Sequence, residues 1–350
     1  MPAQNLLQEL AVLAGAADGD ACWPEPSWNV VKEIGALHWS LPQEDGGTGL
    51  AGPDLLDCYE QLAGACLTTC FILSQRDAAC RRIRDSENSA LARELLPPLA
   101  RGDCFATVGL SQLSTSRQHG KPALVGRLEK DKLILDGSMP WVTGAVRADH
   151  FVTGAALDDG RQILTVLPAE LPGVCIGPPL PLMALQGSMT AEVSCQMVEV
   201  DRRWLLAGPA ERIMATGKGG TGGLETSCLA LGLAGAAVDY LHGEAKQRAD
   251  LGPMAQRLEE SRQGLRDELH RLSQSGTADA AVALRARANA FVLHATQSAL
   301  TASKGTGFLR DHPAQRWARQ ALFFLVWSCP RPAAEATLAY LTPRDEFACP

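Results

Sequence analysis

The sequence predicts an α+β protein of three parts: an N-terminal α-helical domain, a middle β-barrel-like domain and a C-terminal four-helix bundle. Helical periodicity of apolar residues fills both ends of the chain, and short β-prone runs separated by turn residues fill the middle. A length of 350 residues exceeds one average domain and agrees with several. We place the domains at residues 1–103, 104–206 and 207–350.

Three helical runs are expected in the first domain. Residues 29–37 are amphipathic, residues 53–69 carry leucine and alanine along one side, and residues 90–100 form a run that ends near Gly102. A turn-rich connector, residues 39–49, joins the first two runs.

The middle domain is expected to be all β. Its β-prone runs, separated by Gly, Asp and Pro, are residues 105–110, 123–128, 132–135, 150–155, 162–168 and 192–200. Asp136-Gly137 is interpreted as a tight turn, after which Trp141, Val142 and Thr143 begin the next strand. An exposed indole covers one face of a flat heteroaromatic ring, and a nearby hydroxyl hydrogen-bonds its edge. A core tryptophan followed by a turn threonine is the alternative interpretation.

After residue 206 the pattern is helical again. The long apolar-periodic runs cover residues 224–247, 254–273, 278–301 and 313–326, with short connections between them. Antiparallel helices with short loops form a bundle.

Composition excludes several functional classes. A net charge of −7, with no basic patch between aromatics, argues against a nucleic-acid binder. The 11 cysteines are scattered without a C-x-x-C pair, and the histidines lack metal-ligand spacing, so we expect buried thiols and no metal site. There is neither an 18-residue apolar span nor a signal-like N-terminus, so we expect a soluble, cytoplasmic protein without membrane insertion.

Five motifs follow one another along the chain: Leu41-Pro42 with Gly46-Gly47-Thr48-Gly49; Trp141-Val142-Thr143 with the turn at 144–149; residues 198–201 with 205–208; Gly305-Thr306-Gly307-Phe308; and His312-Pro313 with Arg316 and Arg319. In this order they resemble the acyl-CoA dehydrogenase family of flavoproteins over essentially the whole chain. The resemblance implies the three-domain fold of that family, FAD as cofactor, and acyl-CoA or a related small molecule as substrate. It also implies electron-transfer flavoprotein as a possible partner and a homodimer or homotetramer.

The resemblance also assigns cofactor-binding residues. Trp141 and Thr143 would line the flavin ring, and Leu110 and Ser111 would open the flavin loop in place of the usual Thr-Glu-Pro. Ser116 would hold a phosphate oxygen, and Gly305 and Gly307 would let backbone approach the adenosine. Arg248 would meet the pyrophosphate of a neighbouring subunit's FAD, because a planar five-donor cation suits a diphosphate. A solvated Arg248 that pairs with Asp250 is the alternative.

The catalytic carboxylate of most family members is missing, since Ser328 stands where it is expected. A subset of the family carries its glutamate on the first bundle helix, ten residues before a glycine, and Glu225 matches that spacing to Gly235. Glu225 is therefore the candidate base, although a first-turn glutamate is also favourable for the helix dipole alone. Thr226 replaces the arginine that usually follows. Glu60 either faces the acyl pocket or is half-buried, and we favour half-buried.

Three functions remain open on the sequence. The first is α,β-dehydrogenation of an acyl thioester, by α-proton abstraction and hydride transfer to flavin N5. The second is a flavin-dependent oxidase or monooxygenase on a substrate without CoA. The third is a degenerate, non-catalytic family member.

Overall fold

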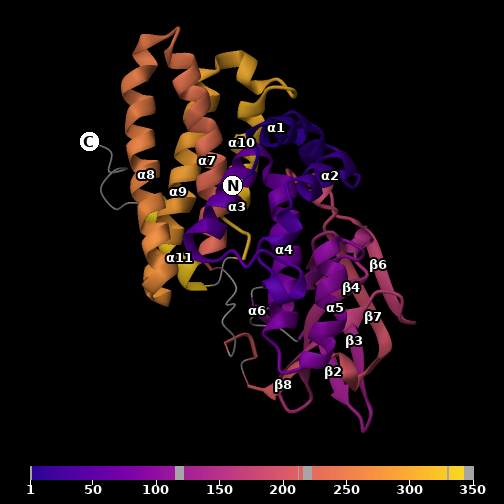
Figure 1. Cartoon of the computed structure of the whole chain (residues 1–350). Helices are drawn as coiled ribbons and strands as arrows, with labels where there is room; N and C mark the ends of the chain where they lie inside the picture. Colours follow the sequence, from indigo (N-terminus) through magenta and orange to yellow (C-terminus); the bar gives the residue numbers. More distant parts are fainter. Residues whose placement is uncertain (1, 115–121, 212, 216–222, 329–330, 343–350) are drawn as a thin grey trace.

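The computed structural model describes residues 2–114, 122–211, 213–215, 223–328 and 331–342. Helices come first, a curved sheet lies in the middle and a helical bundle comes last, as the sequence predicts. The bundle and the sheet lie on opposite sides of the molecule, and the N-terminal helices lie between them (Figure 1).

The N-terminal part contains α-helices and two short 3-10 turns. Their bounds are α1 Gln4–Gly19, α2 Glu25–Glu33, η1 Ala36–His38, η2 Gln43–Asp45, α3 Gly52–Ala65, α4 Leu67–Arg84 and α5 Ser89–Arg101. The helix expected over residues 53–69 is wrong in extent, because the backbone at Cys66 is extended (φ −150°, ψ 101°) and separates α3 from α4. Cys66 is neither glycine nor proline, so the sequence contains no signal for this break.

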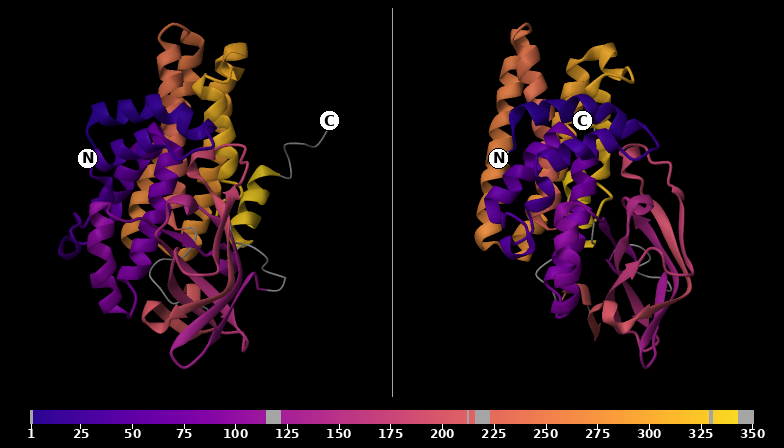
Figure 2. Two further views of the ribbon diagram at one scale, coloured as in Figure 1. Left: turned by 90° about the vertical axis from the view of Figure 1, so that its right-hand side faces the viewer. Right: turned by 45° about the vertical axis from the view of Figure 1, so that its right-hand side comes forward.

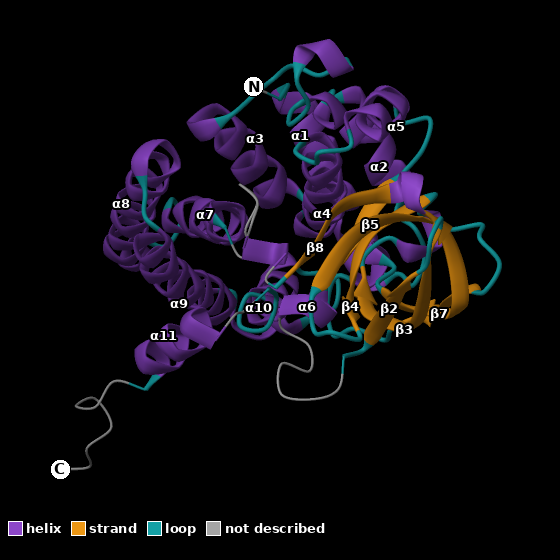
Figure 3. Ribbon diagram, turned by 90° about the horizontal axis from the view of Figure 1, so that it is seen from below, coloured by secondary structure: helices purple, strands orange, loops and turns teal. Residues whose placement is uncertain are grey.

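The middle part is one mixed, eight-stranded sheet. Its strands are β1 Ala106–Gly109, β2 Leu124–Leu128, β3 Lys132–Val142, β4 His150–Leu157, β5 Gln162–Pro168, β6 Val174–Pro179, β7 Ala191–Asp201 and β8 Leu205–Ala210. They run in the order β6-β7-β3-β2-β4-β5-β8, and β1 pairs with β4. Viewed from below, the sheet curls on itself (Figure 3). A one-turn helix, α6 Ser111–Ser114, follows β1.

The expected turn at Asp136-Gly137 is wrong. β3 runs through both residues. The chain turns from β2 into β3 at residues 129–131 instead, where the Glu129 N–H donates to the Lys132 carbonyl. Gly137 lies instead at a register shift between β3 and β7, with φ 122°. A Cβ there would lie 2.2 Å from the Ala123 carbonyl oxygen, so this bulge requires glycine. Trp141 therefore ends a long strand rather than beginning a new one.

The C-terminal part is built from long helices that stand side by side (Figures 1 and 2). Their bounds are α7 Leu224–Ala245, α8 Gly252–Ser275, α9 Ala278–Ala302, α10 Pro313–Phe323 and α11 Arg331–Leu341, with 3-10 turns η7 Ala249–Leu251 and η8 Lys304–Phe308 between them. α7 is long and apolar enough to cross a membrane by length and composition, but 72% of its most apolar window is buried inside the protein.

Helix α4 belongs to two hydrophobic cores. Its first half, from Leu67 to Leu73, packs with α3, α7 and α9. Its second half, with Cys80 and Ile83, packs with the inner face of the sheet and with α5. The helix lies between the bundle and the sheet in Figure 3. α4 therefore fixes the first bundle helices relative to the ends of β1 and β3.

Asp18, at the end of α1, joins the three parts of the chain. Its side chain is 2% exposed. One carboxylate oxygen accepts from the Leu185 N–H and from Gln320 Nε2, each at 2.8 Å, and the other accepts from Arg319 Nη2 at 2.8 Å. Arg319 also donates to the Met183 carbonyl at 2.7 Å. The arginine of the last sequence motif thus holds α10 against α1 and the loop after β6.

The cysteines should differ sharply in reactivity. All nine described cysteines are free, with Cys22 and Cys175 exposed. Burial raises the pKa of Cys80 and Cys104 to about 11 and that of Cys195 to about 12, so few of these thiols are ionised at pH 8. We expect a thiol reagent at pH 8 to label Cys22 and Cys175 first, as peptide mapping by mass spectrometry will show. Early labelling of Cys80 would contradict the packing of α4.

Candidate active site

The end of β3 presents an exposed indole. Trp141 is 51% exposed, whereas a core tryptophan would be buried. The Thr143 side chain, two residues on, is buried, and its Oγ1 lies 3.4 Å from Thr190 Oγ1. Thr107 Oγ1 donates to the Thr143 carbonyl at 2.8 Å and fixes the backbone there. The indole is thus open to a ligand beside a rigid strand end.

The loop after β1 lies against the same strand end. A Cβ on Gly109 would lie 2.7 Å from Met139 Sδ and 3.2 Å from Val142 Cγ2, so this glycine brings the following Leu110 and Ser111 close to β3. Leu110 is buried in the sheet core. The Ser111 hydroxyl is buried and has no hydrogen-bond partner among the described residues. A buried hydroxyl without a partner is a candidate to hydrogen-bond the polar edge of a bound ring.

Ser116 lies outside the described residues. The structure places Gly305 and Gly307 in η8, and they differ. A Cβ on Gly307 would lie 2.5 Å from Ser303 Cβ, so the preceding turn of the chain leaves room only for glycine at this position. A Cβ on Gly305 would meet nothing within 4 Å. Gly305 therefore leaves room for a ligand, and Gly307 serves the local turn.

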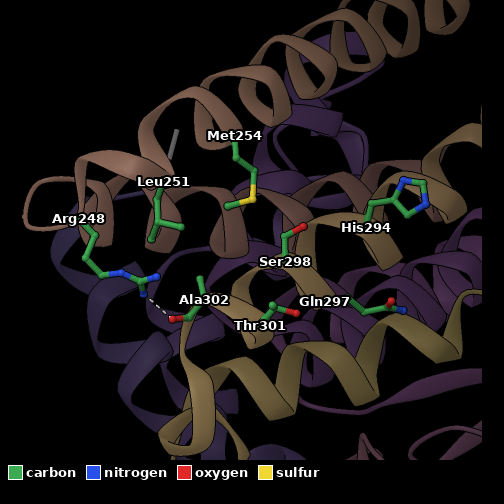
Figure 4. A pocket seen from close by; sticks show the side chains of 8 residues that line it. All are labelled: Arg248, Leu251, Met254, His294, Gln297, Ser298, Thr301 and Ala302. Atoms are coloured by element: carbon green, nitrogen blue, oxygen red, sulfur yellow. Dashed lines mark hydrogen bonds between the residues drawn. The ribbon is translucent and has the colours of Figure 1, made fainter.

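Arg248 lies in a pocket of about 380 Å³ between the start of α8 and the end of α9 (Figure 4). The lining residues are Arg248, Leu251, Met254, His294, Gln297, Ser298, Thr301 and Ala302. Arg248 Nη1 donates to the Ala302 carbonyl at 2.6 Å, and Nη2 lies 3.9 Å from Asp250 Oδ2. The contact with the exposed Asp250 is loose, so the guanidinium is able to bind an anion.

Glu225 lies in the first turn of α7, and Arg81 of α4 is beside it. Arg81 Nη2 is 3.4 Å from Glu225 Oε1. Burial alone would lower the pKa of Arg81, but the Glu225 carboxylate, together with Tyr59 and Asp77, raises it well above its usual value. The Glu225 side chain remains 36% exposed, so a substrate can approach it.

Ser328 follows an aromatic cluster at the position of the usual carboxylate. Trp327 stacks on Phe323 with ring centroids 5.2 Å apart and meets Phe71 edge-on at 5.0 Å. Ser328 has φ 43°, a left-handed backbone conformation that is uncommon for a residue other than glycine. Its side chain carries no carboxylate.

Arg81 could not be predicted from the sequence, because an arginine near the end of a buried helix gives no sign of the distant residue it contacts. Glu60 is 4% exposed, so the expectation that it is half-buried is wrong. Among the described residues no cluster of His, Cys, Asp and Glu is arranged to hold a metal ion.

Comparisons with known proteins agree with the fold. Residues 3–103 match the family model for the N-terminal domain of acyl-CoA dehydrogenases. The probable acyl-CoA dehydrogenase YngJ of Bacillus subtilis is 24% identical over 343 residues, which cover 90% of this chain and 88% of that protein. Butyryl-CoA dehydrogenase of Megasphaera elsdenii has a similar fold, with a TM-score of 0.81 at 18% identity over 97% of this chain and 99% of that one. A glutaryl-CoA dehydrogenase of Mycobacterium smegmatis in complex with FADH2 gives 0.79 at 16%, over 99% and 96%.

A helical bundle and a curved sheet on either side of the N-terminal helices are thus the fold that this chain shares with solved acyl-CoA dehydrogenases. The match of residues 3–103 and the relatives that match nearly the whole length show that the chain is similar to the acyl-CoA dehydrogenase family of flavoprotein oxidoreductases.

Proposed function

We propose that this protein is an FAD-dependent acyl-CoA dehydrogenase that removes hydrogen from the α and β carbons of an acyl thioester. The observation that supports this most is the Trp141 indole, which is 51% exposed at the end of β3. A flat heteroaromatic ring can cover the open face of such an indole.

Each candidate residue has a separate task in this proposal. Trp141 covers the flavin ring, Ser111 hydrogen-bonds its edge, and Glu225 takes the α-proton of the substrate. A bound FAD would supply the acceptor for the hydride of the β carbon. Ser328 cannot take the proton, since a serine hydroxyl needs another base beside it at neutral pH. A carboxylate on α7 is therefore the base that we propose for this chain.

Assembly and partners are part of the same proposal. Arg248 would reach the pyrophosphate of a neighbouring subunit's FAD, which requires a homodimer or homotetramer. Its pocket supports this, because the Arg248 guanidinium has a loose contact with the Asp250 carboxylate and hydrogen-bonds only a backbone carbonyl. Electron-transfer flavoprotein is the proposed electron acceptor. The cytoplasmic location expected from the sequence stays a prediction.

An absorption spectrum tests the proposed function. The purified protein, supplied with FAD, should show flavin absorbance near 450 nm, and anaerobic addition of a short acyl-CoA such as butyryl-CoA should bleach it. A colourless protein that takes up no FAD would overturn the cofactor assignment. A yellow protein that no acyl thioester bleaches would overturn the reaction and leave the cofactor in place.

The replacement of two residues that are usual in the family supports a second candidate function. Thr226 is buried and Ser328 carries no carboxylate, so part of the usual substrate machinery is lost. A flavin-dependent oxidase or monooxygenase on a substrate without CoA would then be the function. Mixing the photoreduced protein with oxygen distinguishes the two, because rapid reoxidation in the presence of ligand favours an oxidase.

Arg248→Met should weaken FAD binding. A charge-assisted hydrogen bond contributes about 1.5–3 kcal/mol, so the dissociation constant should rise roughly 10–100-fold. Titration of the apoprotein, followed by quenching of FAD fluorescence, measures this. Arg257→Met is the matched control, because Arg257 is exposed on α8 and should leave the affinity unchanged. Equal affinities for the two variants would show that Arg248 does not contact the cofactor.

A further inference from the structure

A cluster of buried ionisable side chains lies near Arg81. It consists of Tyr59 on α3 and of Arg76 and Asp77 on α4, each at most 1% exposed. Arg76 Nη1 donates to Asp77 Oδ1 at 2.6 Å and to the Leu37 carbonyl at 2.8 Å, and Nη2 donates to the Leu99 carbonyl at 2.6 Å. These bonds tie the cluster to the backbone of η1 and α5, so its geometry is fixed.

The cluster extends through Tyr59 to Arg81. The Tyr59 hydroxyl donates to Asp77 Oδ2, and it also interacts with the Arg81 guanidinium. Burial, followed by the charge of Asp77, raises the pKa of Tyr59 well above its usual value, so the phenol stays neutral. After Glu225, the neighbouring Tyr59 and Asp77 also raise the pKa of the Arg81 guanidinium. Arg81 therefore borders side chains whose own positions are fixed by hydrogen bonds.

The contact between Arg81 and Glu225 is attractive but incomplete. At 3.4 Å it is an ion pair, and no hydrogen bond to either Glu225 oxygen is found among the residues that the structure describes. Arg81 Nη1 is buried and has no hydrogen-bond acceptor among the described residues. Such contacts are often long in unliganded enzymes and tighten when substrate binds. The carboxylate is thus attracted from one side and still free to accept a proton.

We propose that Arg81 is the positioning residue of the base: its guanidinium, which borders the fixed Tyr59–Arg76–Asp77 cluster, aims the ionised Glu225 carboxylate at the substrate. The inference rests on the proposed function, in which Glu225 takes the α-proton. Its physical basis is that a fixed cation favours the ionised form of a neighbouring carboxylate and limits its orientations. Arg81 does not itself touch the reacting atoms.

Single-turnover flavin reduction by butyryl-CoA tests the proposal in the FAD-loaded protein. Arg81→Gln should lower the limiting rate roughly 10–100-fold, because a misplacement of about 1 Å costs on the order of 100-fold. The substrate concentration at half-saturation should change by less than about threefold, since orientation and not binding is lost. Arg81→Lys keeps the charge without the planar fork and should recover part of the rate.

A double-mutant cycle separates positioning from a structural role. In a Glu225→Gln background, Arg81→Gln should cause no further loss, because there is no carboxylate left to aim. Arg84→Gln is the matched control, since Arg84 lies one turn along α4, pairs with Asp85 and should leave the rate unchanged. Arg81→Lys carries the test if the Gln variant does not fold.

Two other results have separate meanings. An unchanged rate in Arg81→Gln, or the same loss in both backgrounds, would overturn the positioning role while Glu225 remains the base. A Glu225→Gln protein that reduces its flavin as fast as the original protein would instead overturn the base assignment of the proposed function.

Discussion

Glu225→Gln should retain the yellow colour and lose most of the flavin reduction by acyl-CoA. General-base catalysis contributes typically about 10²–10⁴-fold, and we expect a loss in that range. The amide keeps the shape of the side chain but cannot take a proton. Stopped-flow bleaching of the flavin under anaerobic conditions measures the rate, and the FAD content shows that the cofactor site survives.

The control for this variant lies on the same helix. Glu244 is in the last turn of α7, and Glu244→Gln should reduce its flavin at the rate of the original protein. If the Glu225 variant is equally fast, the glutamate serves the helix N-terminus alone, where a negative charge is favourable. Proton transfer would then belong to another group.

Glu60→Ala should produce the largest loss of stability. Glu60 Oε1 lies 3.2 Å from Arg262 Nη2, and Oε2 lies 3.0 Å from Arg266 Nε; the Glu60 side chain is 5% exposed and the two arginines are 22% and 30% exposed. Removal of one partner from a buried ion pair costs about 3–5 kcal/mol, and we expect the lower end of that range because both arginines reach water. The melting temperature should fall on the order of 10 °C, as differential scanning calorimetry will show.

Glu259→Gln is the contrasting variant for the same arginine. Glu259 Oε2 is 3.3 Å from Arg262 Nη1, but its side chain is 35% exposed. Exposed ion pairs contribute about 0–1 kcal/mol, so the melting temperature should hardly change. Similar shifts of the melting temperature for the Glu60 and Glu259 variants would mean that water reaches the whole contact between α3 and α8. Burial of Glu60 would then not be what stabilises this contact.

The sequence predicts elements best where the pattern is local. β5 matches its expected residues 162–168, since an apolar run bounded by turn residues admits one interpretation. β6 was missed because its prolines argue against a strand, and an edge strand tolerates them. The turn expected at Asp136-Gly137 is wrong because the same dipeptide also suits a bulge within one strand.

The candidate site is harder to predict, because it depends on distant residues that tertiary packing brings together. The resemblance in sequence selects Trp141, Arg248 and Glu225 as candidates. It cannot reveal that Arg81 lies beside Glu225, since that contact depends on how α4 passes between two cores. The buried state of Glu60 likewise depends on its partners on α8, and a single glutamate in a helical run looks half-solvated.

The carboxylate of Asp18 has consequences for biosynthesis. Its partner Arg319 follows 301 positions later. At about 5–20 residues per second, a ribosome needs roughly 15–60 s to add that arginine after Asp18 has been made. Until then the Asp18 carboxylate at the end of α1 lacks its arginine partner, and the end of α1 cannot pack in its native position. Nascent chains that stop before α10 should therefore remain open at their first helix and become targets for proteases.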